Sequence, residues 1–116
     1  MSDYELCVLS DATASHEVTA FVREQALRVG AEDSVATHLE VATEMAFQSI
    51  VAHLGDGAQE IRVCCYVQGD HLVVRISHPA CAAECYPTAD LRAYVDAVEV
   101  RERGVQGNDL LLWVQR

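Results

Sequence analysis

The spacing of apolar residues along this chain of 116 residues changes once, and that change limits the folds open to it. Before Gly55 the apolar residues recur every three or four positions, which is typical of amphipathic helices. After Gly57 they alternate with polar residues, which is typical of strands that bury one face. Because the helices are grouped and the strands are joined by short turns, we expect an α+β fold and not a doubly wound parallel sheet.

Two helices are predicted in the first half of the chain. The first follows the capping side chains of residues 10–13, begins near Ala14 and ends at Gly30. Its apolar residues are Val18, Phe21, Val22, Ala26 and Val29. The second helix is predicted over residues 33–53, and its buried stripe is Val35, Leu39, Ala42, Ala46 and Ile50.

The other elements are predicted to be strands, with one short helix among them. The strands are expected at residues 4–8, 61–68, 72–77, 98–100 and 110–114, and the short helix at residues 89–95. A tight turn at Gly69 and Asp70 joins the second and third strands as a hairpin. This order predicts a single domain over residues 1–116, built as a two-layer sandwich. Helices cover one face of its mostly antiparallel sheet.

Charge and composition exclude several classes of partner. The chain has eight arginines, no lysine and 18 acidic residues, so its net charge is −10. An acidic surface disfavours nucleic acid and anionic membranes, and the absence of lysine excludes a phosphate-loop lysine. No apolar run approaches the ~18 residues of a membrane span. The acidic N-terminus is unlike a signal peptide and the cysteine count of five is odd, so we expect a cytoplasmic protein with reduced thiols.

The second predicted helix carries a family resemblance. Residues 40–53, EVATEMAFQSIVAH, resemble the long helix of the histidine-kinase-like ATPases, and more specifically that of the small anti-sigma-factor serine kinases of bacterial partner-switching systems. Residues 94–100, YVDAVEV, are similar to the late helix-to-strand passage of the same family. The resemblance implies the histidine-kinase-like fold. It also implies a partner of the sigma-factor or anti-sigma-factor-antagonist type.

Several residues depart from the pattern of that family. Glu44 matches the glutamate that orients or activates the attacking group, but Gln48 stands where the family has an asparagine ligand for magnesium. His78 stands at or near the aspartate that accepts a hydrogen bond from adenine, and Pro79 after it lacks a backbone donor. Residues 81–95 contain no glycine, so the lid over the ATP site looks shortened and its phosphate-binding segment absent. We therefore expect a retained fold and a lost ATP site.

These residues support three competing hypotheses about function. The first is a regulatory protein-binding domain that needs no cofactor. The alternative is an active serine/threonine kinase, in which Glu44 is catalytic and Gln48 and His78 belong to an ATP and magnesium site. The third is a metal or thiol sensor built on His78, Cys81 and Cys85, whose spacing lacks the paired pattern of a zinc site. We expect no zinc, because small residues and cysteines also fill a shortened loop.

The sequence also predicts an assembly. Members of the family that this chain resembles act as dimers, and the first predicted strand has little to cover its outer edge. We therefore expect a homodimer with residues 4–8 and the helix over residues 18–29 near the contact. The acidic surface favours a basic protein partner, and salt should weaken that association.

Overall fold

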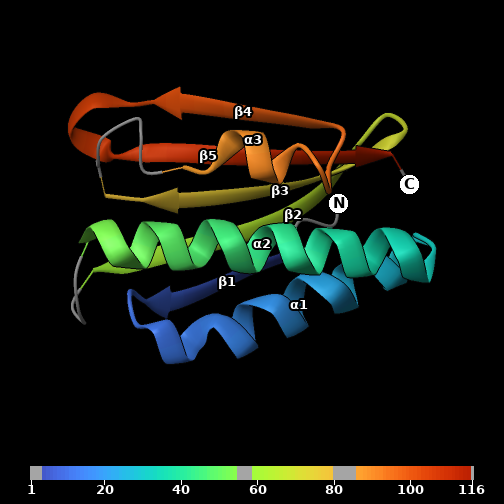
Figure 1. Cartoon of the computed structure of the whole chain (residues 1–116), viewed down its shortest axis with the longest axis horizontal. Coiled ribbons are helices and arrows are strands. Elements are labelled where there is room, and N and C mark those ends of the chain that lie inside the picture. The colour runs from blue at the N-terminus through green and yellow to red at the C-terminus, as the bar shows by residue number, and fades with distance from the viewer. Residues whose placement is uncertain (1–3, 55–58, 80–85, 116) are drawn as a thin grey trace.

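The computed structural model describes residues 4–54, 59–79 and 86–115 (Figure 1). In chain order the elements are β1 (Tyr4–Leu9), η1 (Ala12–Ala14), α1 (Ser15–Arg28), α2 (Asp33–Leu54), β2 (Glu60–Gln68), β3 (His71–His78), α3 (Thr88–Leu91), β4 (Ala97–Glu102), η3 (Gly104–Gln106) and β5 (Asn108–Gln115). The predicted helix stop at Gly55 and the cysteines Cys81 and Cys85 lie outside the described residues.

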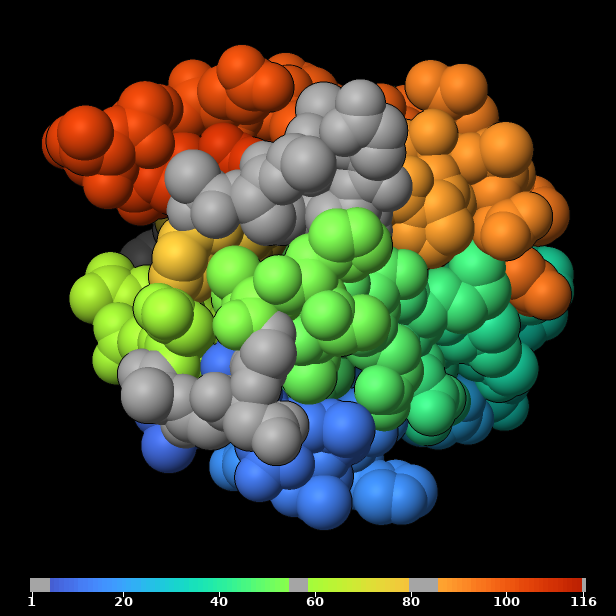
Figure 2. Space-filling model, turned by 60° about the vertical axis from the view of Figure 1, so that its left-hand side comes forward, coloured from blue at the N-terminus to red at the C-terminus, as the bar shows by residue number. Residues whose placement is uncertain are grey.

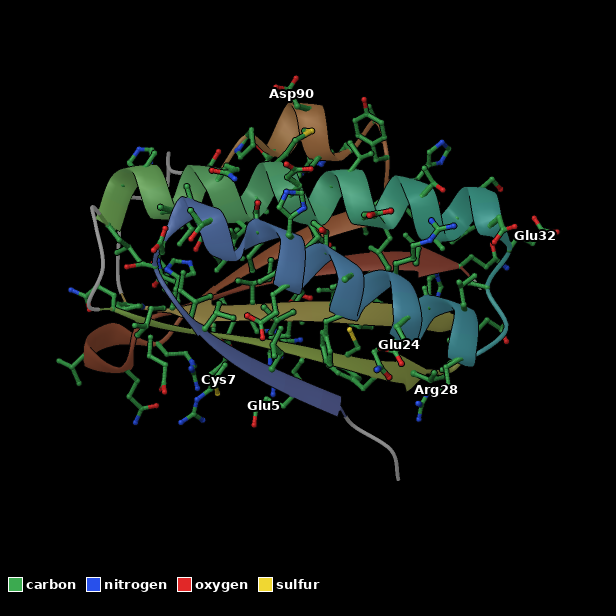
Figure 3. The ribbon with its side chains drawn as sticks, turned by 90° about the horizontal axis from the view of Figure 1, so that it is seen from below. Glu5, Cys7, Glu24, Arg28, Glu32 and Asp90 are labelled. Carbon is green, nitrogen blue, oxygen red and sulfur yellow. The ribbon has the colours of Figure 1, made fainter. Side chains whose placement is uncertain are left out.

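The strands form one antiparallel sheet in the order β1-β2-β3-β5-β4, so β1 and β4 are its two edges. Helices α1 and α2 lie side by side on one face of this sheet (Figures 1 and 3). The predicted α+β fold with an antiparallel sheet and one helix-covered face is therefore confirmed.

The first two helices begin and end where the sequence predicts. The Asp11 carboxylate accepts a hydrogen bond of 3.0 Å from the backbone of Thr13 at the start of η1. Gly30 has a φ of +92°, the left-handed conformation that commonly follows a helix. Arg23 of α1 then joins the two helices, because its guanidinium lies 3.0 Å from the Thr37 hydroxyl and 3.4 Å from the Glu40 carboxylate of α2.

The third helix is shorter than predicted. The sequence predicts a helix over residues 89–95, but α3 is the single turn Thr88–Leu91. The backbone N–H of Asp96 already donates to the carbonyl oxygen of Trp113 in β5, at 2.8 Å. The chain must therefore leave its helical path before Asp96 in order to enter the sheet as β4.

The core lies between the two helices and the covered face of the sheet. Its largest fully buried side chains include Leu39, Phe47 and Ile50 from α2 and Ile76, Leu110 and Leu112 from the sheet. None of the helices in the described ranges combines the length and apolar character that crossing a bilayer requires.

Candidate functional site

Glu44 and Gln48 lie on the side of α2 that faces α1. Glu40, Glu44 and Gln48 follow one another at intervals of four, so they share one side of the helix. Glu40 contacts Arg23 of α1, and the Gln48 amide donates a hydrogen bond of 3.5 Å to the carbonyl oxygen of Ala12 in η1. Glu44 lies between them, exposed, with no hydrogen bond or ion pair to any described residue.

A different side of α2 faces the segment around α3. The ring of His38 meets the ring of Tyr94 edge to face, with their centroids 5.9 Å apart. Helical periodicity places Met45 and Ser49, seven and eleven residues after His38, on this same side. The side of α2 toward α3 therefore presents a thioether and a hydroxyl. The i, i+4 spacing predicted correctly that Glu44 and Gln48 share a face, but only the contacts of α2 show which neighbour that face meets.

His78 ends β3 in a buried polar cluster. Its side chain is buried, and its ring Nδ1 lies 2.7 Å from the carbonyl oxygen of Pro79. Because a carbonyl only accepts, Nδ1 carries the proton, and Nε2 of the neutral ring accepts from the Tyr86 hydroxyl at 2.5 Å. The two rings also pack edge to face, with centroids 5.6 Å apart. Sequence reasoning missed Tyr86, because nothing in the chain marks it as a partner of His78.

Burial favours the neutral form of this histidine. Burial is the main effect and lowers the pKa of His78 below its ordinary value, against the hydrogen bond to Pro79 and the negative charge of Asp109, which act in the opposite direction. The Asp109 carboxylate is itself buried, and the guanidinium of Arg103 lies 3.1 Å from it. The cluster therefore favours a neutral imidazole, and both of its ring nitrogens form hydrogen bonds within the chain.

Gly107 closes the backbone around this cluster. It has a φ of +105°, and a side-chain carbon added there would lie 2.2 Å from the carbonyl oxygen of His78. Only glycine permits this approach of the β4–β5 connection to the end of β3. Figure 2 looks onto this end of the molecule, where the end of α2, the start of β2, the end of β3 and the β4–β5 connection gather.

The hydrogen bonds of Gln48 and of His78 lead to different neighbours. Glu44 and Gln48 lie toward α1 and η1, whereas His78 bonds to Tyr86 and Pro79. In the described part of the chain no three histidine, cysteine or acidic side chains are placed to hold a metal ion. Cys81 and Cys85, the other candidates for a metal or thiol site, lie outside that part.

Comparisons with known proteins support the fold. No protein-family model and no curated protein sequence matches this chain. The structure is similar, with a TM-score of 0.80 and 18% sequence identity, to "The crystal structure of the RsbU and RsbW domains of Rv1364c from Mycobacterium tuberculosis". The match covers 99% of this chain and 32% of that chain, so the other protein is much longer. The chain therefore has the RsbW-like ATPase fold, as the resemblance of its sequence implies.

Proposed function

We propose that this chain is a regulatory protein-binding domain of a bacterial partner-switching system, which acts in the cytoplasm without binding ATP or transferring a phosphoryl group. The main support for this proposal is the burial of His78 and its hydrogen bond to Tyr86. The family that the sequence resembles has a carboxylate acceptor for adenine at or near this position. Here the position holds a buried imidazole, and the acceptor nitrogen of that ring already takes the hydroxyl of Tyr86.

The placement of the acidic and amide side chains on α2 also supports the loss of activity. Phosphoryl transfer depends on positioning and on charge neutralisation by metal. Gln48 reaches back to η1, and Glu44 stands exposed with no described partner. A magnesium ligand must reach the phosphates of ATP, whereas the Gln48 amide is bonded to η1, which supports the loss of that role.

The alternative is an active serine/threonine kinase with divergent motifs, in which Glu44 is catalytic and Gln48 and His78 contact magnesium and ATP. Calorimetric titration of the purified chain with ATP and magnesium separates the two functions. We expect no specific binding, and no phosphate transfer from labelled ATP to candidate partner proteins. Micromolar binding that depends on magnesium and is abolished by Glu44→Ala or Gln48→Ala, but not by the exposed control Glu24→Ala, would overturn the loss of the ATP site, and phosphate transfer to a partner would in addition establish the kinase.

We further propose that the domain is a homodimer that forms through the edge of β1. Among the described strands β1 pairs with β2 alone, and at its end Leu9 leaves 55% of its surface exposed. Cys7 of β1 is exposed and points away from the helices (Figure 3). Light scattering should give twice the monomer mass, and mild oxidation should cross-link the wild type but not Cys7→Ser. A strict monomer at high protein concentration would exclude the dimer.

The proposed partner is a protein of the sigma-factor or anti-sigma-factor-antagonist type. With a net charge of −10, the chain favours a basic surface on that partner. We expect the association, captured from a bacterial lysate, to weaken as sodium chloride is raised from about 50 to 500 mM. Capture that does not respond to salt would contradict this electrostatic account.

A further inference from the structure

The face of the sheet away from the helices carries charge and aromatic side chains. The strand register places Cys64, Arg75 and Leu111 in one row across this face, with Arg62, Ser77 and Asp109 in the next row. On the other side of Arg75 lies a row of Tyr66, Val73 and Trp113. We call this surface the open face. Glu5 and Cys7 of β1 also point to it (Figure 3).

A cavity of about 490 Å³ opens at one end of the open face. The residues that line it include Glu5, Glu60, Arg62, Arg75, Ser77 and Arg103. Three of the eight arginines of an acidic chain therefore meet at one cavity. They come from three different segments, β2, β3 and the β4–β5 connection, so the tertiary structure alone brings them together.

Arg75 differs from the other two arginines of the cavity. Arg62 lies 3.5 Å from the Glu60 carboxylate, and Arg103 lies 3.1 Å from Asp109. Arg75 forms no ion pair with any described residue, and its guanidinium lies 5.8 Å from the centroid of the Tyr66 ring. Its row neighbours Cys64 and Leu111 are buried, so the positive charge of Arg75 is flanked by buried apolar side chains. There an anion is attracted more strongly than at a fully solvated surface.

We propose that this cavity binds a phosphoryl group, with Arg75 as its main contact and with Arg62, Arg103 and the Ser77 hydroxyl around it. A guanidinium offers paired N–H donors that match two oxygens of a phosphate, and the hydroxyl adds one donor more. The volume lies within the range of ordinary ligand pockets and leaves room for the group that carries the phosphate.

The acidic residues of the cavity limit the ligand to one phosphoryl group. Glu5 and Glu60 lie on the β1–β2 side of the cavity; Glu60 is paired with Arg62, and the exposed Glu5 carboxylate repels a second phosphate. This arrangement is unsuited to nucleic acid, whose successive phosphates need a continuous basic track. The ligand is therefore a phosphate monoester or free phosphate, with neutral or basic groups beside the phosphate.

Titration followed by NMR tests the site. The ¹H–¹⁵N spectrum of the whole chain, including the arginine Nε–H signals, is recorded against inorganic phosphate and against N-acetyl-phosphoserine amide, with sodium chloride at matched ionic strength as the reference. We expect a saturable shift of the Arg75 Nε–H signal with the phosphates only. Tighter binding of the phosphoserine probe would point to a phosphorylated protein segment, and equal binding would point to free phosphate, and both support the site.

Substitutions on the same face make the test specific. Arg75→Gln should weaken phosphate binding by roughly tenfold or more, because a charged hydrogen-bond donor is lost. Arg75→Lys keeps the charge without the paired donors and should weaken it less. The control Arg101→Gln makes the same charge change on the open face outside the cavity, where Arg101 is paired with Glu99, and should leave binding within about twofold. An absence of saturable binding, or equal binding by wild type and a well-folded Arg75→Gln, would overturn the proposal.

Discussion

The two faces of the sheet bury apolar side chains in different ways. Leu110, Leu111 and Leu112 are consecutive in β5 and are all fully buried, yet Leu110 and Leu112 belong to the core under the helices and Leu111 to the open face. No helix of the described ranges covers the open face. Complete burial of a residue therefore does not identify the layer that buries it.

Long side chains of the sheet itself cover the open face. The ring of Trp113 meets the ring of His71 with centroids 5.9 Å apart, and Arg75 lies against Tyr66. Such side chains shield apolar surface along their stems and rings while their polar ends reach solvent. They can move into a space left by a smaller residue, whereas helices that also pack on other core residues cannot. The covered face should therefore be more sensitive to substitution than the open face.

The largest expected effect is a difference in lost stability between two neighbouring residues of β5 that face opposite sides of the sheet. Leu112→Ala should lower the free energy of unfolding by about 3–5 kcal/mol, because it leaves a cavity between sheet and helices. Leu111→Ala should lower it by about 2–3 kcal/mol, because neighbouring side chains can collapse into the space. Urea denaturation followed by circular dichroism measures both. Equal losses would show that the open face is as rigidly packed as the core.

A smaller effect is expected at the end of the sheet, where the β4–β5 connection forms one wall of the cavity lined by Arg62, Arg75 and Arg103, here called the arginine cavity. Gly107→Ala should cost about 2–4 kcal/mol, because the added carbon strains a positive φ and strikes the backbone of His78. The matched control is Gly69→Ala, which also has a positive φ but open space around it, and should cost about 1–2 kcal/mol. If the two variants lost the same stability, the contact with His78 would have no energetic role.

Acidification should act on the His78 cluster. Burial lowers the pKa of His78 in the folded chain, so the unfolded chain binds this proton more readily. The contribution of His78 to stability is complete above the ordinary histidine pKa of about 6.5, and it is lost as the pH falls through the lower folded pKa. Urea denaturation at about pH 7.5 and 5.5 should therefore show a larger loss for the wild type than for His78→Gln. The control His53→Gln, at the exposed end of α2, should keep the wild-type loss.

The smallest expected effect is a difference in thiol labelling between the two faces, which needs no substitution. Cys64 and Cys65 are adjacent in β2 and point to opposite faces. Burial raises the pKa of Cys65 to about 12, so very little thiolate is present near neutral pH. We expect mass spectrometry to find fast labelling of exposed Cys7, slower labelling of Cys64, and labelling of Cys65 only on global unfolding. Faster labelling of Cys65 than of Cys64 would reverse the comparison.

Periodicity in the sequence was enough to predict the fold class and most of the elements, although α3 is shorter than predicted. The apolar stripe of α2, the alternation in β2 and β3, and the turn at Gly69 are local signals, because each depends on residues a few positions apart. They predicted the helix-covered antiparallel sheet that the structure confirms. Alternation also predicted that successive residues of a strand face opposite sides, but it does not say which side the helices cover.

Tertiary contacts decided what surrounds the candidate residues. Spacing placed Glu44 and Gln48 on one side of α2, but only Arg23 and Ala12, distant in the sequence, show that this side meets α1 and η1. The Tyr86 hydroxyl on His78 and the arginine cavity likewise join segments that no local pattern connects. The physical reason is the range of the forces. Hydrophobic periodicity acts within a turn or a strand, whereas the partner of a polar side chain depends on the path of the whole chain in space.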